Sequence, residues 1–269
     1  MILPPFEGPR LKIRRAQKHI TDLEQCVTEF GASVKLTMVP VKEEGELICY
    51  LMRFNERPPE DIPALVGDAL HNLRSALDIL ICDIARLRGK SVDKLKFPFA
   101  ANVEALEKIL SKDFPRLGED VVDGIRAQQP FIGGNLALRG LHDLDIDDKH
   151  ETVLPCYLVA RGRFAAERMV PAGVLDWVAG MGLDFRMAQM AIHEGNVMWS
   201  KAGANPWLMI QPLDGPPQPT FPDGLPFAGI PILEVLEGLT EVVGQVVECF
   251  AAEFGGGNDD TTRGPTLNN

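Results

Sequence analysis

Residues 67–78, with the sequence GDALHNLRSALD, combine side chains that could do acid–base or electrostatic chemistry. His71 and Ser75 are four residues apart, as are Arg74 and Asp78, so each pair could touch on a helix. At about 100° per residue these four side chains share one arc beside an arc of leucines. Solvated helix faces usually carry Glu, Lys and Gln, whereas Asn, Ser and Asp are weaker helix formers. We therefore expect a polar site or network on this helix.

A second segment, residues 141–151 (LHDLDIDDKHE), places carboxylates where a helix should be apolar. Asp145 and Asp148 fall on the same face as leucines that should pack inward, and His142 and Lys149 flank that face. An inward carboxylate must be paired, hydrogen-bonded or protonated, because burying an isolated charge is costly. His71 and Arg74 are the obvious partners, so the two helices are expected to meet.

Two functional interpretations follow from this cluster. In the first, the chain is a nuclease-like or other phosphoester-directed enzyme: His71 acts as general acid and base, Arg74 stabilises developing negative charge, and Asp145 or Asp148 orients them. In the second, the chain is a non-catalytic interaction or ligand-binding protein, and the same groups hold its helices together. The catalytic candidates are His71, Arg74, Asp145 and Asp148; the other network members are Asp68, Asn72, Ser75, Asp78, His142 and Lys149.

No cofactor or metal is predicted. A set made of His71, Asp78, His142, Asp145 and Asp148 would suit a hard or borderline cation, but no pair has a recognised metal-binding spacing. The Gly133-Gly134 pair is typical of a turn and lacks the phosphate-loop and dinucleotide-binding patterns. The five cysteines are widely spaced and form no CxxC or Cys/His cluster.

The overall charge bears on partners and favours the non-catalytic interpretation. The 38 acidic and 27 basic residues give a net charge of −11, which disfavours extended binding to nucleic acid or to an anionic membrane. Nucleic acid, a second copy of the chain and other partners all stay open. The apolar run at 77–87 is too short and too charged to span a bilayer, and residues 1–10 do not resemble a signal peptide. A cytoplasmic location is expected.

Apolar spacing predicts the elements that position the cluster. The pattern indicates an α+β fold: a helical core, an N-terminal β-hairpin, a small antiparallel sheet in the C-terminal half and a C-terminal helix. We expect one domain over 1–254, with a helical part at about 10–155, a β-rich part at about 156–228 and a disordered tail at 255–269. The predicted helices are 11–31, 61–88, 103–112, 119–127, 135–152 and 231–253, and the predicted strands include 33–39, 47–54, 186–192 and 207–210.

The order of motifs resembles that of a group of bacterial proteins with no established activity. These are marked by GDxLHNLRSALDHL, FPI, QPY and LxxLDxxDKHR, which correspond here to residues 67–78, 96–98, 128–130 and 141–150. The resemblance covers roughly residues 10–155. The chain departs from the pattern at Ile79, where the group has His, and at Glu151, where it has Arg.

A looser likeness is to HEPN-type helical proteins, many of which are ribonucleases with Arg four to six residues before His. The formal matches, Arg14 with His19 and Arg186 with His193, lie outside the central helix, where the order is reversed.

Overall fold

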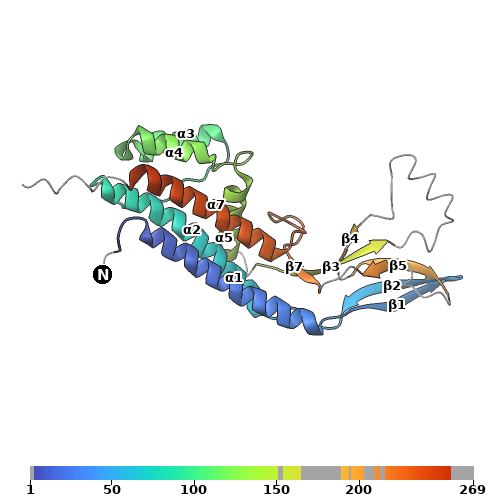
Figure 1. Cartoon of the computed structure of the whole chain (residues 1–269). Coiled ribbons are helices and arrows are strands. Elements are labelled where there is room, and N and C mark those ends of the chain that lie inside the picture. The colour runs from blue at the N-terminus through green and yellow to red at the C-terminus, as the bar shows by residue number, and fades with distance from the viewer. Residues whose placement is uncertain are drawn as a thin grey trace, which may run out of the picture. The chain divides into compact units, whose positions relative to one another are not determined.

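The computed structural model describes residues 3–150, 154–164, 189–193, 195–202, 210–212 and 216–255. The fold is α+β, as predicted: helices, an N-terminal antiparallel hairpin, a small second sheet and a C-terminal helix (Figure 1). None of the helices in these residues is long and apolar enough to cross a membrane.

Each predicted helix is present, with its ends displaced by a few residues. The largest displacement is at the start of the first helix, which begins at Glu7 rather than at residue 11. Polar side chains cap two of the helices: Asn102 accepts a hydrogen bond from the Ala105 N–H, and Asn135 accepts one from the Leu138 N–H. The helices are α1 (Glu7–Ser33), α2 (Asp61–Leu87), α3 (Val103–Asp113), α4 (Glu119–Gln128), α5 (Leu136–His150) and α7 (Ile232–Phe254), with a 3-10 turn, η1 (Pro115–Leu117), between α3 and α4.

The strands form two antiparallel sheets. One has the order β1-β2-β5, and in the other β3 pairs with β4, β6 and β7. The hairpin β1-β2 was predicted, and its turn contains Gly45 in the left-handed region, with φ 60°. The strands are β1 (Leu36–Glu44), β2 (Leu47–Phe54), β3 (Tyr157–Phe164), β4 (Gln189–His193), β5 (Val197–Lys201), β6 (Ile210–Pro212) and β7 (Gln218–Thr220).

One detail of the β region differs from the sequence-based expectation, and two expected strands can be compared only in part. The predicted hairpin is not separate from the C-terminal strands, because β5 pairs with β2 from Leu47 opposite Lys201 to Leu51 opposite Val197. The strand expected at 186–192 is observed as β4, whose first described residue is Gln189. Of the strand expected at 207–210, only Ile210 is described, and it begins β6. Residues 186–188 and 207–209 lie outside the described part of the chain, as does the predicted tail beyond Gly255.

The contacts divide the chain into two compact units. Unit 1 contains residues 1–22, 64–154 and 233–269, and unit 2 contains residues 23–63 and 155–232. A boundary therefore falls within α1. The single domain predicted for 1–254 stays a prediction. Each sheet lies in unit 2, whose buried core includes Phe30, Val34, Phe54 and Leu158.

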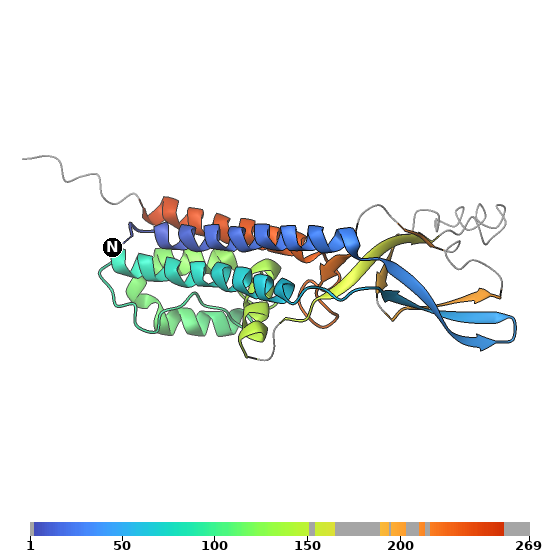
Figure 2. The same cartoon turned by 90° about the horizontal axis from the view of Figure 1, so that it is seen from below.

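Helix α2 supplies the apolar centre of unit 1. Leu73, Leu77 and Leu80 have no exposed surface, as the length of its leucine arc predicted. It runs antiparallel to the unit 1 part of α1, since the Phe6 N–H donates to Asp83 while His19 lies near Asp68. Figure 2 shows α1, α2 and α7 with their long axes roughly aligned. The polar face of α2 is thereby held in a fixed orientation.

Candidate functional site

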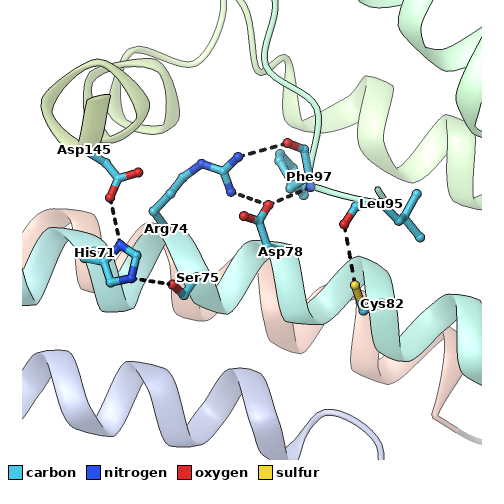
Figure 3. Close-up of polar contacts among 8 residues, drawn as sticks. All are labelled: His71, Arg74, Ser75, Asp78, Cys82, Leu95, Phe97 and Asp145. Atoms are coloured by element: carbon cyan, nitrogen blue, oxygen red, sulfur yellow. Dashed lines mark hydrogen bonds and ion pairs between the residues drawn. The ribbon is translucent and has the colours of Figure 1, made fainter. Parts of the chain in front are cut away.

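The predicted meeting of α2 and α5 is confirmed at His71 and Asp145. The two side chains approach within 3.2 Å, from His71 Nδ1 to Asp145 Oδ1 (Figure 3). The Asp145 side chain is 6 % exposed, whereas that of His71 is 49 % exposed. On the other side of the ring, Nε2 lies 3.4 Å from Ser75 Oγ. The site therefore has a solvent-accessible imidazole held between a buried carboxylate and a hydroxyl.

Arg74 points along α2 in another direction and is almost completely buried, with 8 % of its side chain exposed. It forms an ion pair with Asp78, as the spacing of four residues predicted, and donates a 3.3 Å hydrogen bond to the Phe97 carbonyl. Its guanidinium lies 4.6 Å above the centre of the Phe99 ring. Arg74 is thus committed to contacts inside the fold.

Side chains of α2 satisfy the backbone of the segment that crosses it. The Phe97 N–H donates a 2.9 Å hydrogen bond to Asp78, while Arg74 donates to the carbonyl of the same residue. One turn further along α2, the Cys82 thiol lies 3.6 Å from the Leu95 carbonyl oxygen (Figure 3). Backbone groups in a segment without strand pairing need such partners when they are buried. The polar face of α2 therefore fixes the path of residues 95–97.

Asp148 is half-buried and lies against the α2 backbone at Gly67. A Cβ atom on Gly67 would be 2.6 Å from Asp148 Oδ2, so a larger residue at this position would require the Asp148 carboxylate to move. Burial raises the pKa of Asp148, and the neighbouring carboxylates of Asp145 and Asp68 raise it further. Asp148 thus belongs to the same acidic neighbourhood as Asp145 but in a position that disfavours its charged form.

His142 lies on the Arg74 side of the network. Its ring stacks on Phe99 with centroids 4.3 Å apart and planes 1° from parallel. Burial lowers the pKa of His142 to about 4, and the positive charges of Arg74 and Arg139 lower it further. Its Nδ1 is buried and has no hydrogen-bond partner among the described residues. His142 is therefore neutral at pH 7, a packing element rather than a charge partner.

The remaining predicted network members lie toward α1. The Asn72 side chain accepts a 3.2 Å hydrogen bond from Lys12 and donates a 2.7 Å one to the Asp68 carbonyl oxygen. The Asp68 carboxylate is 64 % exposed and lies 3.9 Å from His19 Nδ1. The side chain of Lys149 lies outside the described residues.

A pocket of about 760 Å³ lies beyond the segment that α2 holds, and the sequence did not predict it. Residues 93–99 form one wall, and the end of α3 with η1 forms the other. Phe97 and Phe114 are buried there, whereas Lys94, Lys96, Lys112 and Arg116 are exposed. The sequence signal that could have indicated the pocket was the basic and aromatic composition of residues 94–99 and 112–116. The two stretches are separate in sequence, so this composition did not show that they lie together.

Comparisons with known proteins found no matching family model, curated protein or solved structure. Within the described ranges, no group of three or more His, Cys, Asp or Glu side chains is placed to hold a metal ion.

Proposed function

We propose that this chain is a non-catalytic ligand-binding protein whose binding site is the pocket between residues 93–99 and the α3–η1 turn. In this proposal the polar residues of α2 are structural. They hold one wall of the pocket in place and do not act on a substrate.

The observation that carries the proposal is the engagement of Arg74. Its guanidinium contacts Asp78, the Phe97 carbonyl and the Phe99 ring, and very little of it is exposed. A group that stabilises charge on a substrate must reach that substrate. Arg74 instead contacts the backbone of Phe97 and the ring of Phe99, which both line the pocket. These contacts favour a preorganised wall over an open reaction centre.

The dimensions and lining of the pocket support the same conclusion. Ligand pockets typically enclose roughly 300–1,000 Å³ and combine apolar surface with a few polar groups. This one has a volume of about 760 Å³, a floor that includes Leu95, Phe97 and Phe114, and charged side chains at its edge. A rigid wall lowers the cost of binding, because less of the protein must become ordered.

A thermal-shift screen with a chemically varied set of small molecules tests the proposal. Ile109 lines the pocket and is half-buried, so Ile109→Trp should place an indole ring in it and obstruct ligand binding. Val103, on the same helix, is 47 % exposed and does not line the pocket, so Val103→Trp is the matched control. We expect compounds that stabilise the wild type and Val103→Trp to have no effect on Ile109→Trp. A screen without any stabilising compound, or stabilisation that persists in Ile109→Trp, would contradict the proposal.

The second candidate function is phosphoester-directed catalysis centred on His71, and one observation favours it. A half-exposed imidazole lies between the buried Asp145 carboxylate and the Ser75 hydroxyl. This arrangement suits a general base whose orientation is fixed by an acid. Arg74 has no assigned role in this candidate function, because its guanidinium already contacts Asp78, the Phe97 carbonyl and the Phe99 ring.

A nuclease assay decides between the two functions. Wild type and His71→Ala are compared on mixed RNA and on single-stranded DNA with varied divalent ions, and circular dichroism checks that both are folded. Cleavage by the wild type that is lost in folded His71→Ala would favour the enzyme. Equal, background-level cleavage by both proteins favours the ligand-binding function.

A further inference from the structure

We infer that the pocket takes an organic phosphate, a small molecule with an anionic phosphate group and an apolar body. This inference rests on the proposed ligand-binding function and adds the chemical class of the ligand. It is carried by the charge, pairing and backbone conformation of the residues around the pocket.

The pocket is positive although the chain is strongly negative. Its lining contains four cationic side chains, Lys94, Lys96, Lys112 and Arg116, and two anionic ones, Asp93 and Asp113. This excess of two positive charges stands against a net charge of −11 for the whole chain. Cationic side chains gathered at one concave surface raise the local concentration of anions and attract them specifically to that place.

The four cations are also not neutralised. In the part of the chain that the structure describes, none of the ion pairs involves Lys94, Lys96, Lys112 or Arg116. Within the described residues, the only hydrogen bond made by one of these four side chains runs from Arg116 to the Asp93 carbonyl oxygen, at 3.5 Å.

Three arginines of unit 1 behave differently. Arg88 pairs with Asp120, Arg126 with Glu107 and Arg139 with Asp143. The four pocket cations have no such carboxylate partner among the described residues, which leaves them available to an external anion.

The backbone at Lys94 supports a role for its side chain. Lys94 has φ 54°, in the left-handed region that favours glycine and asparagine. It is in a tight turn closed by a 3.1 Å hydrogen bond from the Leu95 N–H to the Val92 carbonyl. A turn needs no lysine at this position, and glycine would form it with less strain. The strained lysine is accounted for if its charge binds a ligand.

The apolar floor decides between a bare ion and an organic molecule. Phe97 and Phe114 lie beneath it, 1 % and 2 % exposed, and the accessible apolar surface comes from half-buried Phe99 and Ile109 and from exposed Pro115. A volume of about 760 Å³ is far larger than a phosphate ion needs. Lysines bind phosphate as point charges, and Arg116 can offer two parallel donors. The combination fits a ligand with its phosphate at the basic edge and its apolar part over the floor.

Titrations of the 269-residue chain with three probes test this inference. The probes are phenyl phosphate, inorganic phosphate and benzylamine. Isothermal calorimetry or NMR in a phosphate-free buffer measures their binding. We expect phenyl phosphate to bind more tightly than inorganic phosphate because of its ring, and benzylamine not to bind. Raising the NaCl concentration should weaken phenyl phosphate binding, since the attraction at an open pocket is screened.

Two variants separate the role of the pocket charges from folding. Lys112→Glu should weaken phenyl phosphate binding by about tenfold or more, because it exchanges an attractive charge for a repulsive one. Arg15→Glu makes the same charge change at an exposed position on α1, outside the pocket lining, and should change the affinity less than about twofold. Lys94→Gly should weaken binding while leaving the melting temperature unchanged or higher, since glycine relieves the left-handed strain.

The outcomes distinguish this inference from the proposed function. If Arg15→Glu weakens phenyl phosphate binding as much as Lys112→Glu does, the attraction is a general charge effect and the phosphate site is refuted. If phenyl phosphate does not bind, but benzylamine or a neutral compound binds and Ile109→Trp abolishes that binding, the pocket binds ligands but not organic phosphates. If nothing binds the pocket at all, both the inference and the proposed function fail.

Discussion

Replacing Arg74 by alanine is expected to reduce the free energy of unfolding by about 3 kcal/mol. Removing one partner of a buried ion pair typically costs about 3–5 kcal/mol, because the other charge is left without compensation. Here Asp78 is 29 % exposed and keeps its hydrogen bond from the Phe97 N–H, so water and backbone offset part of that loss. The Phe97 carbonyl also loses its donor, which costs about 1–3 kcal/mol for a buried acceptor. These effects overlap, which places the total near the lower end of the range.

Urea denaturation followed by circular dichroism measures this change, with Arg126→Ala as the matched control. Arg126 also forms an arginine–carboxylate pair, with Glu107, but its side chain is 40 % exposed. A solvent-exposed pair contributes about 0–1 kcal/mol, so the control should lose much less. A loss below about 0.5 kcal/mol for Arg74→Ala, typical of a surface substitution, would refute the structural role of Arg74. Equal losses in the two variants would do the same.

The same variant has a second, local readout at His142. The positive charge of Arg74 is one of the causes that lower the pKa of His142, after burial. In folded Arg74→Ala, an NMR titration of the His142 ring should therefore give a pKa above the wild-type value of about 4. An unchanged titration would show that the guanidinium does not lie against the Phe99–His142 stack.

Three further predictions follow from the same region. The neutral His142 stabilises the fold fully above about pH 6.5, and this stability is lost as the pH falls toward the folded-state pKa of about 4. Paired denaturation curves of the wild type and His142→Phe measure this loss. Between pH 7 and pH 5 the free energy of unfolding of the wild type should fall by about 1–2 kcal/mol relative to His142→Phe. Because the raised pKa of Asp148 disfavours its ionised form in the fold, Asp148→Asn should raise the melting temperature at pH 7, and the gain should vanish in acid. Gly67→Ala should destabilise the wild type, because its Cβ would meet the Asp148 carboxylate. In an Asp148→Ala background the same substitution should stabilise the fold by about 0.5–1 kcal/mol through helix propensity. A double-mutant cycle without coupling would contradict this.

Local patterns in the sequence were sufficient for the helices and for one contact of the site. The leucine arc of α2 has the period of a helix that buries one face, and its residues are buried as expected. Asp145 was predicted to need a partner because a carboxylate in line with leucines cannot remain buried alone, and His71 is such a partner. Both arguments depend only on the geometry of single helices and on the cost of burying a charge.

Other features depended on contacts between segments far apart in the chain. Helix spacing predicted the Arg74–Asp78 pair but could not indicate that Phe97 binds to both side chains, since residues 95–97 have no periodic pattern that fixes their path. Strand β5 has no local signal that assigns it to β2, nearly 150 residues earlier, because antiparallel pairing depends on register and surroundings.

The basic pocket shows the same division between local and tertiary information. Lys94 and Lys96 alternate with buried residues on one segment, while Lys112 and Arg116 end another, and each pair alone resembles ordinary solvated charge. Only the packing of residues 93–99 against the α3–η1 turn brings the four cations around one apolar floor. Sequence determined the charges and the helices; the tertiary structure decided where those charges meet, because proximity across a loop is set by packing and not by spacing along the chain.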